Sequence, residues 1–307
     1  MKRKDKKVNV KELLYKYKFF FKKSFGQNFL TDDDLLESIV VSSGITKDDD
    51  VIEIGCGAGT LTKVLARHAK SVTGYEIDKN LKPVLEDYLS EEKNVKINFN
   101  DVMKVPMEVL EKDFDEYTVV ANIPYYITTP IVTMFLESAK KVKKLVLTVQ
   151  KEVADRFSAK EGTSEYGSIT AAINFYGSAE TVMVIGREKF TPPPKVDSAV
   201  VAITIDRSKQ NGTNKEHFRE VLKAAFGNRR KTLSNNLSAV FGIEKKIAEE
   251  ILLKMDKNPQ VRGETFSAGD FAILTEELEK LDVFDKPVSS KRTRKQKTED
   301  KKIKSDL

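Results

Sequence analysis

The stretch Asn122-Ile123-Pro124-Tyr125, followed by Tyr126, combines residue types that can hold a flat ring carrying an amine. An Asn carbonyl accepts hydrogen bonds from an exocyclic amine, and a Tyr ring stacks on the face of a base. The preceding apolar run Val119-Val120-Ala121 predicts a buried strand, which must end at Pro124 because proline has no N–H for the ladder. Ligands of open α/β sheets bind at such strand ends. The stretch also suits an ordinary turn, in which the Asn bonds to local backbone and the Tyr packs.

A second stretch that could bind a ligand is the glycine-rich turn Gly55-Cys56-Gly57-Ala58-Gly59. It follows a predicted strand, Val51–Ile54, and precedes a predicted helix through Leu61, Val64 and Leu65. Glycines allow a ligand to approach backbone N–H groups closely, and the helix N-terminus adds positive potential. This strand, turn and helix predict a nucleotide-binding unit with Gly55 and Gly57 at the ligand.

Acidic residues end the next two predicted strands. Glu76 closes the strand Val72–Glu76, 21 residues after Gly55, where a carboxylate can accept both hydroxyls of a ribose. Asp101 follows the strand Val95–Phe99 and can accept a hydrogen bond from an adenine amino group, although it also suits the capping of a turn. Asp78 is more naturally the cap of the helix that follows it.

These strand ends are expected to converge, because alternating strands and helices predict a parallel sheet whose carboxyl edge forms a crevice. The glycines, Glu76, Asp101 and Asn122 then surround one adenosine-like molecule. The spacing is G-x-G-x-G, and Thr60 occupies the position of the third glycine in the dinucleotide fingerprint. The pattern therefore favours S-adenosylmethionine over NAD as the cofactor.

The rest of the chain predicts the elements that position these residues. A helix is expected after a cap at Thr31 or Asp32, another from about Pro130, a strand at Leu145–Val149, a helix over 168–176, and a closing antiparallel pair at Val182–Ile185 and Ala199–Ile205. Three prolines after Phe190 predict a stiff segment that holds this ring in place. A polar linker at 208–214 separates a segment of helical periodicity that extends to about Leu281.

The 307 residues are 40% hydrophobic and 33% charged, which indicates a globular protein with one large and one small domain. No apolar run approaches the length of a membrane span, and no signal-peptide core follows the basic N-terminus, so a cytoplasmic location is expected. The single cysteine, Cys56, fits a reducing compartment. His68 and His217 are far apart, and no metal site is expected.

The net charge of +6 is concentrated at the two ends of the chain. Residues 1–23 contain ten Lys or Arg and two acids, and residues 286–307 contain nine and three. Basic arms that contact a polyanion are expected, with a solubilising tail as the alternative for 286–307. Lys22 and Lys23, and the cluster Asn228-Arg229-Arg230-Lys231-Thr232, are candidate phosphate contacts; for the cluster, a solvated helix end is the alternative.

The chain resembles the ribosomal small-subunit RNA adenine N6,N6-dimethyltransferases from about residue 9 to 283. The matching stretches are KKSFGQNFL (22–30), EIGCGAGTLT (53–62), YEID (75–78), ND (100–101), NIPYYITTP (122–130), FTPPPKVDSAV (190–200) and FGNRRKTLSNNL (226–237). The departures are Ile123, where the family commonly has Leu, and the lysine-rich tail beyond Val283, which the family pattern lacks.

The resemblance implies a Rossmann-like class I methyltransferase sheet with helices on both faces and a small all-helical C-terminal domain. The expected parts are a basic N-terminal arm or helix (1–23), the methyltransferase domain (24–207), a helical RNA- or ribosome-contacting domain (215–283) and a basic, disordered tail (284–307). The family's cofactor contacts fall on Asn28, Leu30, Gly55, Glu76, Asp101 and Asn122.

The implied activity is transfer of methyl groups to N6 of two adjacent adenosines in a loop near the 3′ end of 16S rRNA, on an assembling small subunit, by a monomer. Asn122 and the Ile123 carbonyl would accept hydrogen bonds from N6, and Tyr125 and Phe190 would sandwich the base. No general base is required, because the proton can leave to water after methyl transfer.

Two other functions remain open. The large-subunit adenine methyltransferases that confer antibiotic resistance share the cofactor motifs and an N-[IL]-P-[YF] stretch, although FGNRRKTLSNNL favours the small-subunit enzymes. A ribosome-assembly factor with dispensable catalysis is the second alternative, and the intact Glu76, Asp101, Asn122 and Tyr125 argue against it.

Overall fold

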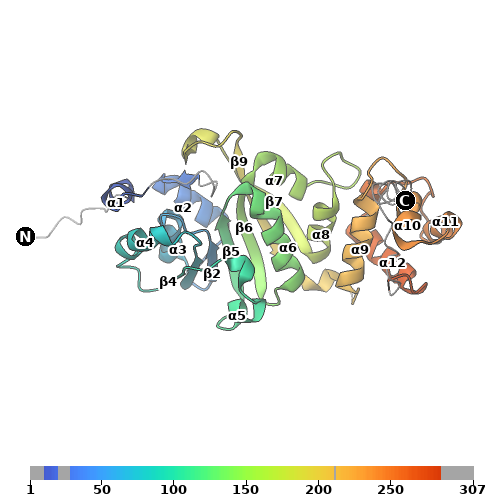
Figure 1. Cartoon of the computed structure of the whole chain (residues 1–307), viewed down its shortest axis with the longest axis horizontal. Helices are drawn as coiled ribbons and strands as arrows, with labels where there is room; N and C mark the ends of the chain where they lie inside the picture. The colour runs from blue at the N-terminus through green and yellow to red at the C-terminus, as the bar shows by residue number, and fades with distance from the viewer. Residues whose placement is uncertain (1–9, 20–27, 211, 285–307) are drawn as a thin grey trace, which may run out of the picture. The chain divides into compact units, whose positions relative to one another are not determined.

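The computed structural model describes residues 10–19, 28–210 and 212–284. Lys22, Lys23 and the tail beyond 284 lie outside these ranges, so the predictions about them stay predictions. The chain forms two compact units (Figure 1). The first contains the described residues up to Lys215 and the segment Glu264–Asp270, and the second contains Glu216–Gly263 and the residues from Phe271 onward.

The first unit is built on a seven-stranded sheet of order β4-β3-β2-β5-β6-β9-β7. The strands are β2 (Asp50–Ile54), β3 (Ser71–Tyr75), β4 (Val95–Asn98), β5 (Tyr117–Asn122), β6 (Val142–Gln150), β7 (Gly177–Ile185) and β9 (Ser198–Ile205). Strands β2 to β6 are parallel, whereas β9 is antiparallel to both β6 and β7. The predicted parallel sheet and its closing antiparallel pair are therefore confirmed.

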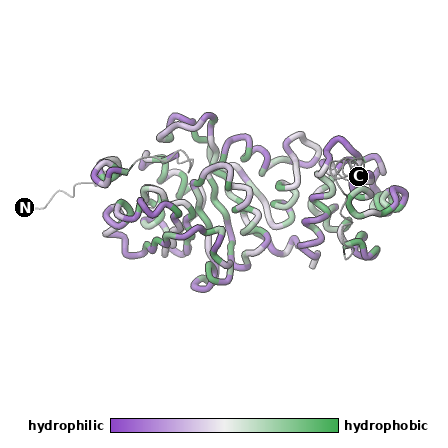
Figure 2. Tube along the Cα trace, viewed as in Figure 1, coloured by the Kyte–Doolittle hydropathy of each residue, from purple (hydrophilic) through white to green (hydrophobic). Residues whose placement is uncertain are grey.

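The sequence explains the burial of this sheet. Strands β2, β5 and β6 are nearly continuous apolar runs, as expected for parallel strands covered on both faces, and Figure 2 shows the central strands mainly in green. The covering helices are α2 (Asp33–Ser42), α3 (Thr60–His68), α4 (Lys82–Tyr88), α5 (Met107–Glu111), α6 (Thr128–Ser138), α7 (Lys151–Phe157) and α8 (Ser168–Tyr176). One apolar cluster joins α2 and α3 to β2, β3, β5 and β6.

Several helix boundaries follow the predicted capping chemistry. Asp32 caps α2, and its carboxylate accepts a hydrogen bond from the Leu35 N–H at 3.2 Å. Asp78 caps the short 3₁₀ helix η2 (Lys79–Leu81) in the same way. Pro130 lies in the first turn of α6, which begins two residues earlier than predicted, at Thr128. The helix α7 had no counterpart in the predictions.

Two further elements flank the glycine-rich turn. The N-terminal helix α1 (Val10–Lys16) packs on α4, and Tyr17 donates a hydrogen bond from its hydroxyl to Asp87 at 2.9 Å. The short strand β1 (Phe29–Leu30) pairs antiparallel with β8 (Phe190–Thr191), which joins segments from opposite ends of the first unit. The structure thus places α1 and β1 beside the glycine-rich turn.

The second unit is helical and has its own core. It is formed by α9 (Lys215–Phe226), α10 (Leu233–Phe241), α11 (Lys245–Lys254) and most of α12 (Ala268–Glu279). The apolar face of α9 buries Phe218, Val221 and Leu222. The predicted linker at 208–214 lies next to the division after Lys215, whereas the grouping of Glu264–Asp270 with the first unit was not predicted. No helix in the described ranges is long and apolar enough to cross a membrane.

Candidate active site at the carboxyl edge of the sheet

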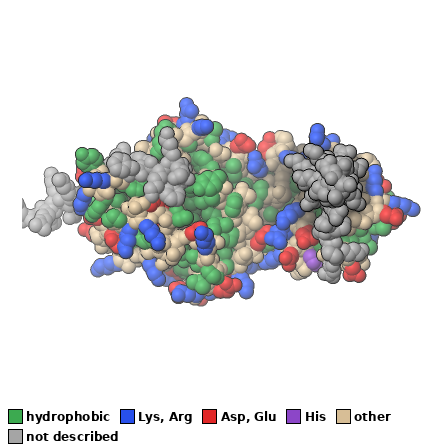
Figure 3. All heavy atoms as spheres, viewed as in Figure 1, with side chains coloured by type: hydrophobic (Ala, Val, Ile, Leu, Met, Phe, Trp, Pro, Cys, Tyr) green, Lys and Arg blue, Asp and Glu red, His purple; other side chains and the backbone are tan. Residues whose placement is uncertain are grey.

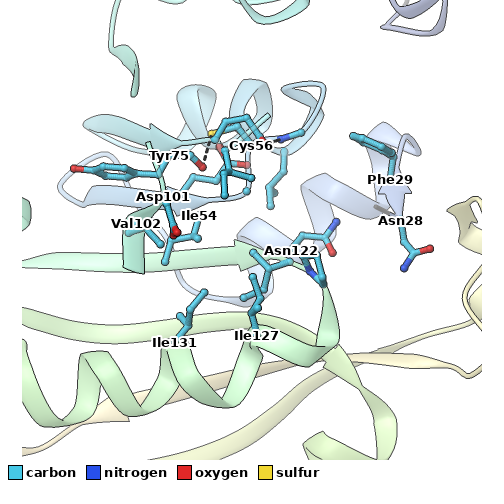
Figure 4. Close-up of a pocket in the computed structure, with 18 of the residues that line it drawn as sticks. Asn28, Phe29, Ile54, Cys56, Tyr75, Asp101, Val102, Asn122, Ile127 and Ile131 are labelled. Carbon is cyan, nitrogen blue, oxygen red and sulfur yellow. Dashed lines mark hydrogen bonds between the residues drawn. The ribbon is translucent and has the colours of Figure 1, made fainter. Parts of the chain in front are cut away.

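A cavity of about 310 Å³ lies at the carboxyl ends of β2, β3, β4 and β5, beside β1 (Figure 4). Eight residues that the sequence analysis selected line it: Asn28, Leu30, Gly55, Gly57, Glu76, Asp101, Asn122 and Tyr125. In Figure 4, Asn122 lies between Asp101 on one side and Asn28 with Phe29 on the other. The predicted convergence of successive strand ends is therefore observed.

The glycine-rich turn needs glycine for both its backbone and its space. Gly55 and Gly57 have φ values of +78° and +54°, which lie in the left-handed region that other residues avoid. A Cβ atom on Gly57 would lie 2.7 Å from the Phe29 ring. The turn therefore brings backbone very close to β1, and any larger residue at this position would displace the Phe29 ring from the wall of the cavity.

Glu76 is held in a fixed orientation by backbone donors. Its Oε2 accepts a hydrogen bond from the Gly57 N–H and its Oε1 accepts one from the Asp78 N–H, both at 2.8 Å. The side chain is only 5% exposed, and burial raises the pKa of its carboxyl, while these two N–H donors oppose the shift. Since each carboxylate oxygen can accept more than one hydrogen bond, Glu76 can also bind ligand hydroxyls.

Asp101 has the predicted capping role and also lies at the cavity. It lines the cavity, and its Oδ1 accepts a hydrogen bond from the Met103 N–H at 3.1 Å, which caps the 3₁₀ helix η3 (Val102–Lys104). The cap fixes the side chain at the strand end but leaves acceptor capacity on the carboxylate. Capping and ligand binding are therefore compatible at this residue.

Asn122 and Tyr125 are held at the end of β5 in different ways. Asn122 is the last residue of β5, and no hydrogen bond joins its carboxamide to any residue in the described ranges. This argues against the alternative in which Asn122 only satisfies local backbone. Tyr125 begins the 3₁₀ helix η4 (Tyr125–Ile127), and its hydroxyl lies 2.6 Å from Oγ of the fully buried Ser198. Burial raises the pKa of the Tyr125 phenol.

The contact with Ser198 was missed in the sequence analysis. Ser198 is the first residue of β9, 73 positions away from Tyr125, so only the antiparallel pairing of β9 with β6 brings it to the site. The neighbouring Tyr126 also lines the cavity, and 70% of its surface is exposed. One tyrosine of the pair is thus held by a buried partner, and the other is open to solvent.

The structure corrects the predicted position of Phe190. Its ring is only 2% exposed, does not line the cavity, and packs in the apolar cluster that contains Leu30, Ile185 and Val200. The cause is the pairing of β8 with β1, which places Phe190 opposite Leu30. In this structure the ring supports the strand beside the cavity and does not face the cavity.

A second buried acid, Glu53 on β2, also lines the cavity and was missed as a site residue. It is 1% exposed, and its Oε2 has no hydrogen-bond partner among the described residues. Burial raises the pKa of this carboxyl to about 7, and the charge of Glu76 adds to the shift. An acid within the otherwise apolar strand Val51–Ile54 was the available sequence signal.

The basic cluster lies in the second unit. Asn228, Arg229, Arg230 and Lys231 are exposed on the turn between α9 and α10. The two histidines are half-buried and contact carboxylates: His68 contacts Glu37, and His217 Nδ1 lies 2.6 Å from Glu279 Oε1. The described residues contain no group of three His, Cys, Asp or Glu that could hold a metal ion.

Comparison with known proteins gives a consistent result. The family model described as ribosomal RNA adenine dimethylase matches residues 18–278. The chain is 44% identical to "Ribosomal RNA small subunit methyltransferase A" of Bacillus licheniformis, over 89% of this chain and 97% of that protein. It is 45% identical to the protein of the same name from Bacillus pumilus, over 89% and 96% of the two chains.

Solved structures agree with the family match. A dimethyladenosine transferase from Plasmodium falciparum superposes with a TM-score of 0.72 at 27% identity, covering 82% of this chain and 98% of the other. The 23S rRNA methyltransferase ErmE gives a TM-score of 0.62 at 25% identity, covering 82% and 100%. The mixed sheet with helices on both faces is thus a class I methyltransferase fold, whose members use S-adenosylmethionine as the methyl donor. The chain belongs to the ribosomal RNA adenine dimethylase family.

Proposed function

We propose that this protein transfers methyl groups from S-adenosylmethionine to N6 of two adjacent adenosines in a loop near the 3′ end of small-subunit rRNA. The observation that supports this most is the Asn122 carboxamide, which has no partner among the described residues and lies beside Tyr125 in the cavity. An unpaired amide next to an aromatic ring suits an adenine. The relatives named "Ribosomal RNA small subunit methyltransferase A" support the choice of RNA.

The residues in the cavity fit the cofactor. The left-handed backbone of Gly55 and Gly57 shapes the turn that lines the cavity, and Glu76 is held by the Gly57 N–H where a ribose would need acceptors. Asp101 can accept from the adenine amino group, and Asn28 and Leu30 line the β1 side. When bound, S-adenosylmethionine supplies an electrophilic methyl group on its sulfonium.

The protein's own contribution is the placement of the acceptor nitrogen. The N6 lone pair of adenine is delocalised into the ring, so methyl transfer depends on strict in-line orientation. Hydrogen bonds from N6 to the Asn122 side-chain carbonyl and to the Ile123 backbone carbonyl would tip the nitrogen toward sp³ and aim its lone pair. Tyr125, whose hydroxyl lies next to Ser198, would cover one face of the base. The proton leaves to water after transfer.

The correction at Phe190 affects the energetics of base capture. Stacking on one aromatic ring contributes about 1–3 kcal/mol, whereas extrusion of a base from a stack costs a few kcal/mol. With Tyr125 as the ring held at the cavity, the stacking free energy does not clearly exceed the cost of extruding a base. An adenosine that is already unpaired is therefore the favoured substrate. This supports a loop, and not a duplex, as the target.

The two units would bind different parts of the substrates. We assign cofactor and adenine binding to the first unit, and phosphate contacts to Arg229, Arg230 and Lys231 of the second, together with Lys22 and Lys23 of the N-terminal arm. A monomer acting in the cytoplasm on an assembling small subunit is the expected form. The enzyme then binds its substrate mainly through contacts with RNA phosphates, which do not depend on the base sequence.

Replacement of Asn122 by Ala tests the assignment. We expect RNA binding within about twofold of the wild type and a loss of about 10²–10³ in single-turnover methyl transfer, typical of a lost oriented hydrogen-bond group. Asn100→Ala, which changes another asparagine that lines the cavity, is the matched control. Wild-type turnover in Asn122→Ala would refute the proposed role.

The large-subunit enzymes remain a second candidate because ErmE shares the fold over 82% of this chain. Methyl transfer assays with isolated large-subunit RNA and small subunits, run in parallel, distinguish the two. A protein that binds small subunits and supports their assembly equally well with Asn122→Ala would instead be an assembly factor with dispensable catalysis.

A further inference from the structure

The turn that carries the basic cluster is held from within the second unit by one buried side chain. Asn236, on α10, is 5% exposed. Its Nδ2 donates hydrogen bonds to the Ala225 carbonyl at 3.0 Å and to the Asn228 carbonyl at 3.1 Å. Ala225 is in the last turn of α9, and Asn228 begins the basic stretch, so a single carboxamide bridges the end of one helix and the turn that follows.

Other contacts fix the two ends of this turn. The Asn228 carbonyl also accepts from the Lys231 N–H at 3.1 Å, and the Asn228 Oδ1 accepts from the Arg230 N–H at 3.3 Å. At the far end, Thr232 caps α10, and the Leu233 N–H donates to the Val261 carbonyl at 2.7 Å. The backbone of the turn is therefore closed on itself, while the side chains of Arg229, Arg230 and Lys231 are exposed.

We propose that Asn236 is a positioning residue that holds Arg229, Arg230 and Lys231 in a fixed arrangement matching successive phosphates of an RNA backbone. This inference rests on the proposed function and refines its second unit. Three cations on a flexible loop would attract RNA by charge alone. A turn whose protein backbone is fixed would hold the three cations against several phosphates at once. It would therefore select the geometry of the RNA backbone as well as its charge.

The two possibilities differ in the salt dependence of binding. The slope of log K against log salt counts the phosphates neutralised together, at about 0.9 per contact. Substitution of Asn236 removes no charge. If the cations act only as diffuse charge, the slope is unchanged. If their arrangement matters, each lost contact lowers the slope by about one unit and weakens binding about eightfold near 0.1 M salt.

The experiment measures binding of the full-length protein to unmethylated small subunits over a range of salt concentrations. The variants are Asn236→Ser, the neighbouring Asn235→Ser as matched control, and the triple neutralisation Arg229→Gln, Arg230→Gln, Lys231→Gln. We expect Asn236→Ser to lower the slope by at least one unit and Asn235→Ser to leave it unchanged. An unchanged slope in a folded Asn236→Ser protein would overturn the inference.

Loss of folding is separated from loss of positioning by thermal unfolding and by a second variant. Insertion of one glycine between Arg230 and Lys231 leaves Asn236 and all three charges in place but changes their spacing. We expect the same reduced slope, and a wild-type slope would contradict the inference. If the triple neutralisation also binds like the wild type, the turn does not contact RNA at all, and the proposed function of the second unit fails with it.

Discussion

Glu76 holds the glycine-rich turn in place, and we propose that it binds the ligand as well. Its carboxylate accepts two backbone N–H groups, one from the glycine-rich turn and one from the start of the next helix. The same group therefore shapes the glycine-rich turn, and we propose that it also offers acceptors to the cofactor. The spacing from Gly55 predicted the ligand role, whereas the bond to Gly57 became apparent only in the structure.

Replacement of Glu76 by Ala should weaken S-adenosylmethionine binding by about 10- to 100-fold, since hydrogen bonds to a charged group contribute about 1.5–3 kcal/mol. Titration calorimetry of the folded variant measures this directly. Glu37→Ala, a change at a half-exposed acid on α2 that does not line the cavity, serves as control. Unchanged affinity in Glu76→Ala would disprove the ribose assignment.

Glu53 gives a pH dependence of stability. Because its folded-state pKa is about 7, above the ordinary value of 4.5, the folded protein holds this proton more tightly than the unfolded chain. The contribution of this proton to the free energy of unfolding is complete below pH 4.5. It is lost as pH rises to about 7, and it amounts to on the order of 3 kcal/mol in all.

The isosteric change Glu53→Gln should remove this dependence. The variant is expected to gain stability relative to the wild type as pH rises from 4.5 to 7, in urea unfolding at a series of pH values. Glu180→Gln, at an exposed residue on β7, controls for a surface charge. Parallel stability curves for wild type and Glu53→Gln over this range would show that Glu53 does not titrate there.

At the scale of elements, local signals predicted the strand ends well. The apolar runs before Glu76, Asp101 and Asn122, and the breaker Pro124, are features of neighbouring residues. The pairing of β1 with β8 and the contact between Tyr125 and Ser198 depend on segments far apart in the chain. For that reason Phe190, which was predicted to face the base, is instead buried against Leu30.

The buried position of Phe190 predicts the behaviour of Phe190→Leu. This change keeps an apolar side chain of similar size, so we expect a stability loss of about 1 kcal/mol and turnover within a few-fold of the wild type. Thermal unfolding and single-turnover methyl transfer measure the two effects. Phe175→Leu, a buried ring on α8 away from the cavity, is the control. A large loss of turnover with unchanged stability would restore the stacking role.

At the scale of the molecule, the charges on one face of the first unit bear on how RNA is recognised. Figure 3 shows Lys and Arg mixed with Asp and Glu over this face of the first unit, with no block of one sign. The cavity accepts one exposed base, and the predicted phosphate contacts carry no sequence information. We therefore expect the fold of the RNA on the small subunit, and not the loop sequence alone, to select the target.

A comparison of two substrates tests this selection. Methyl transfer to unmethylated small subunits should exceed transfer to a short naked hairpin with the target loop by at least about tenfold in kcat/KM, because the hairpin lacks the surrounding backbone. A permuted loop presented on the same stem controls for background transfer. Equal efficiency on hairpin and subunit would show that local sequence suffices.

The central claim is that this protein dimethylates adenine N6 in small-subunit rRNA. The most direct measurement is incubation of the purified protein with labelled S-adenosylmethionine and unmethylated small subunits, followed by mass spectrometry of the nucleosides and mapping of the labelled positions. We expect N6,N6-dimethyladenosine at two adjacent positions near the 3′ end, and labelling about 10²–10³ slower with Asn122→Ala. Label absent from small-subunit adenosines, or found only in large-subunit RNA supplied in parallel, would contradict it.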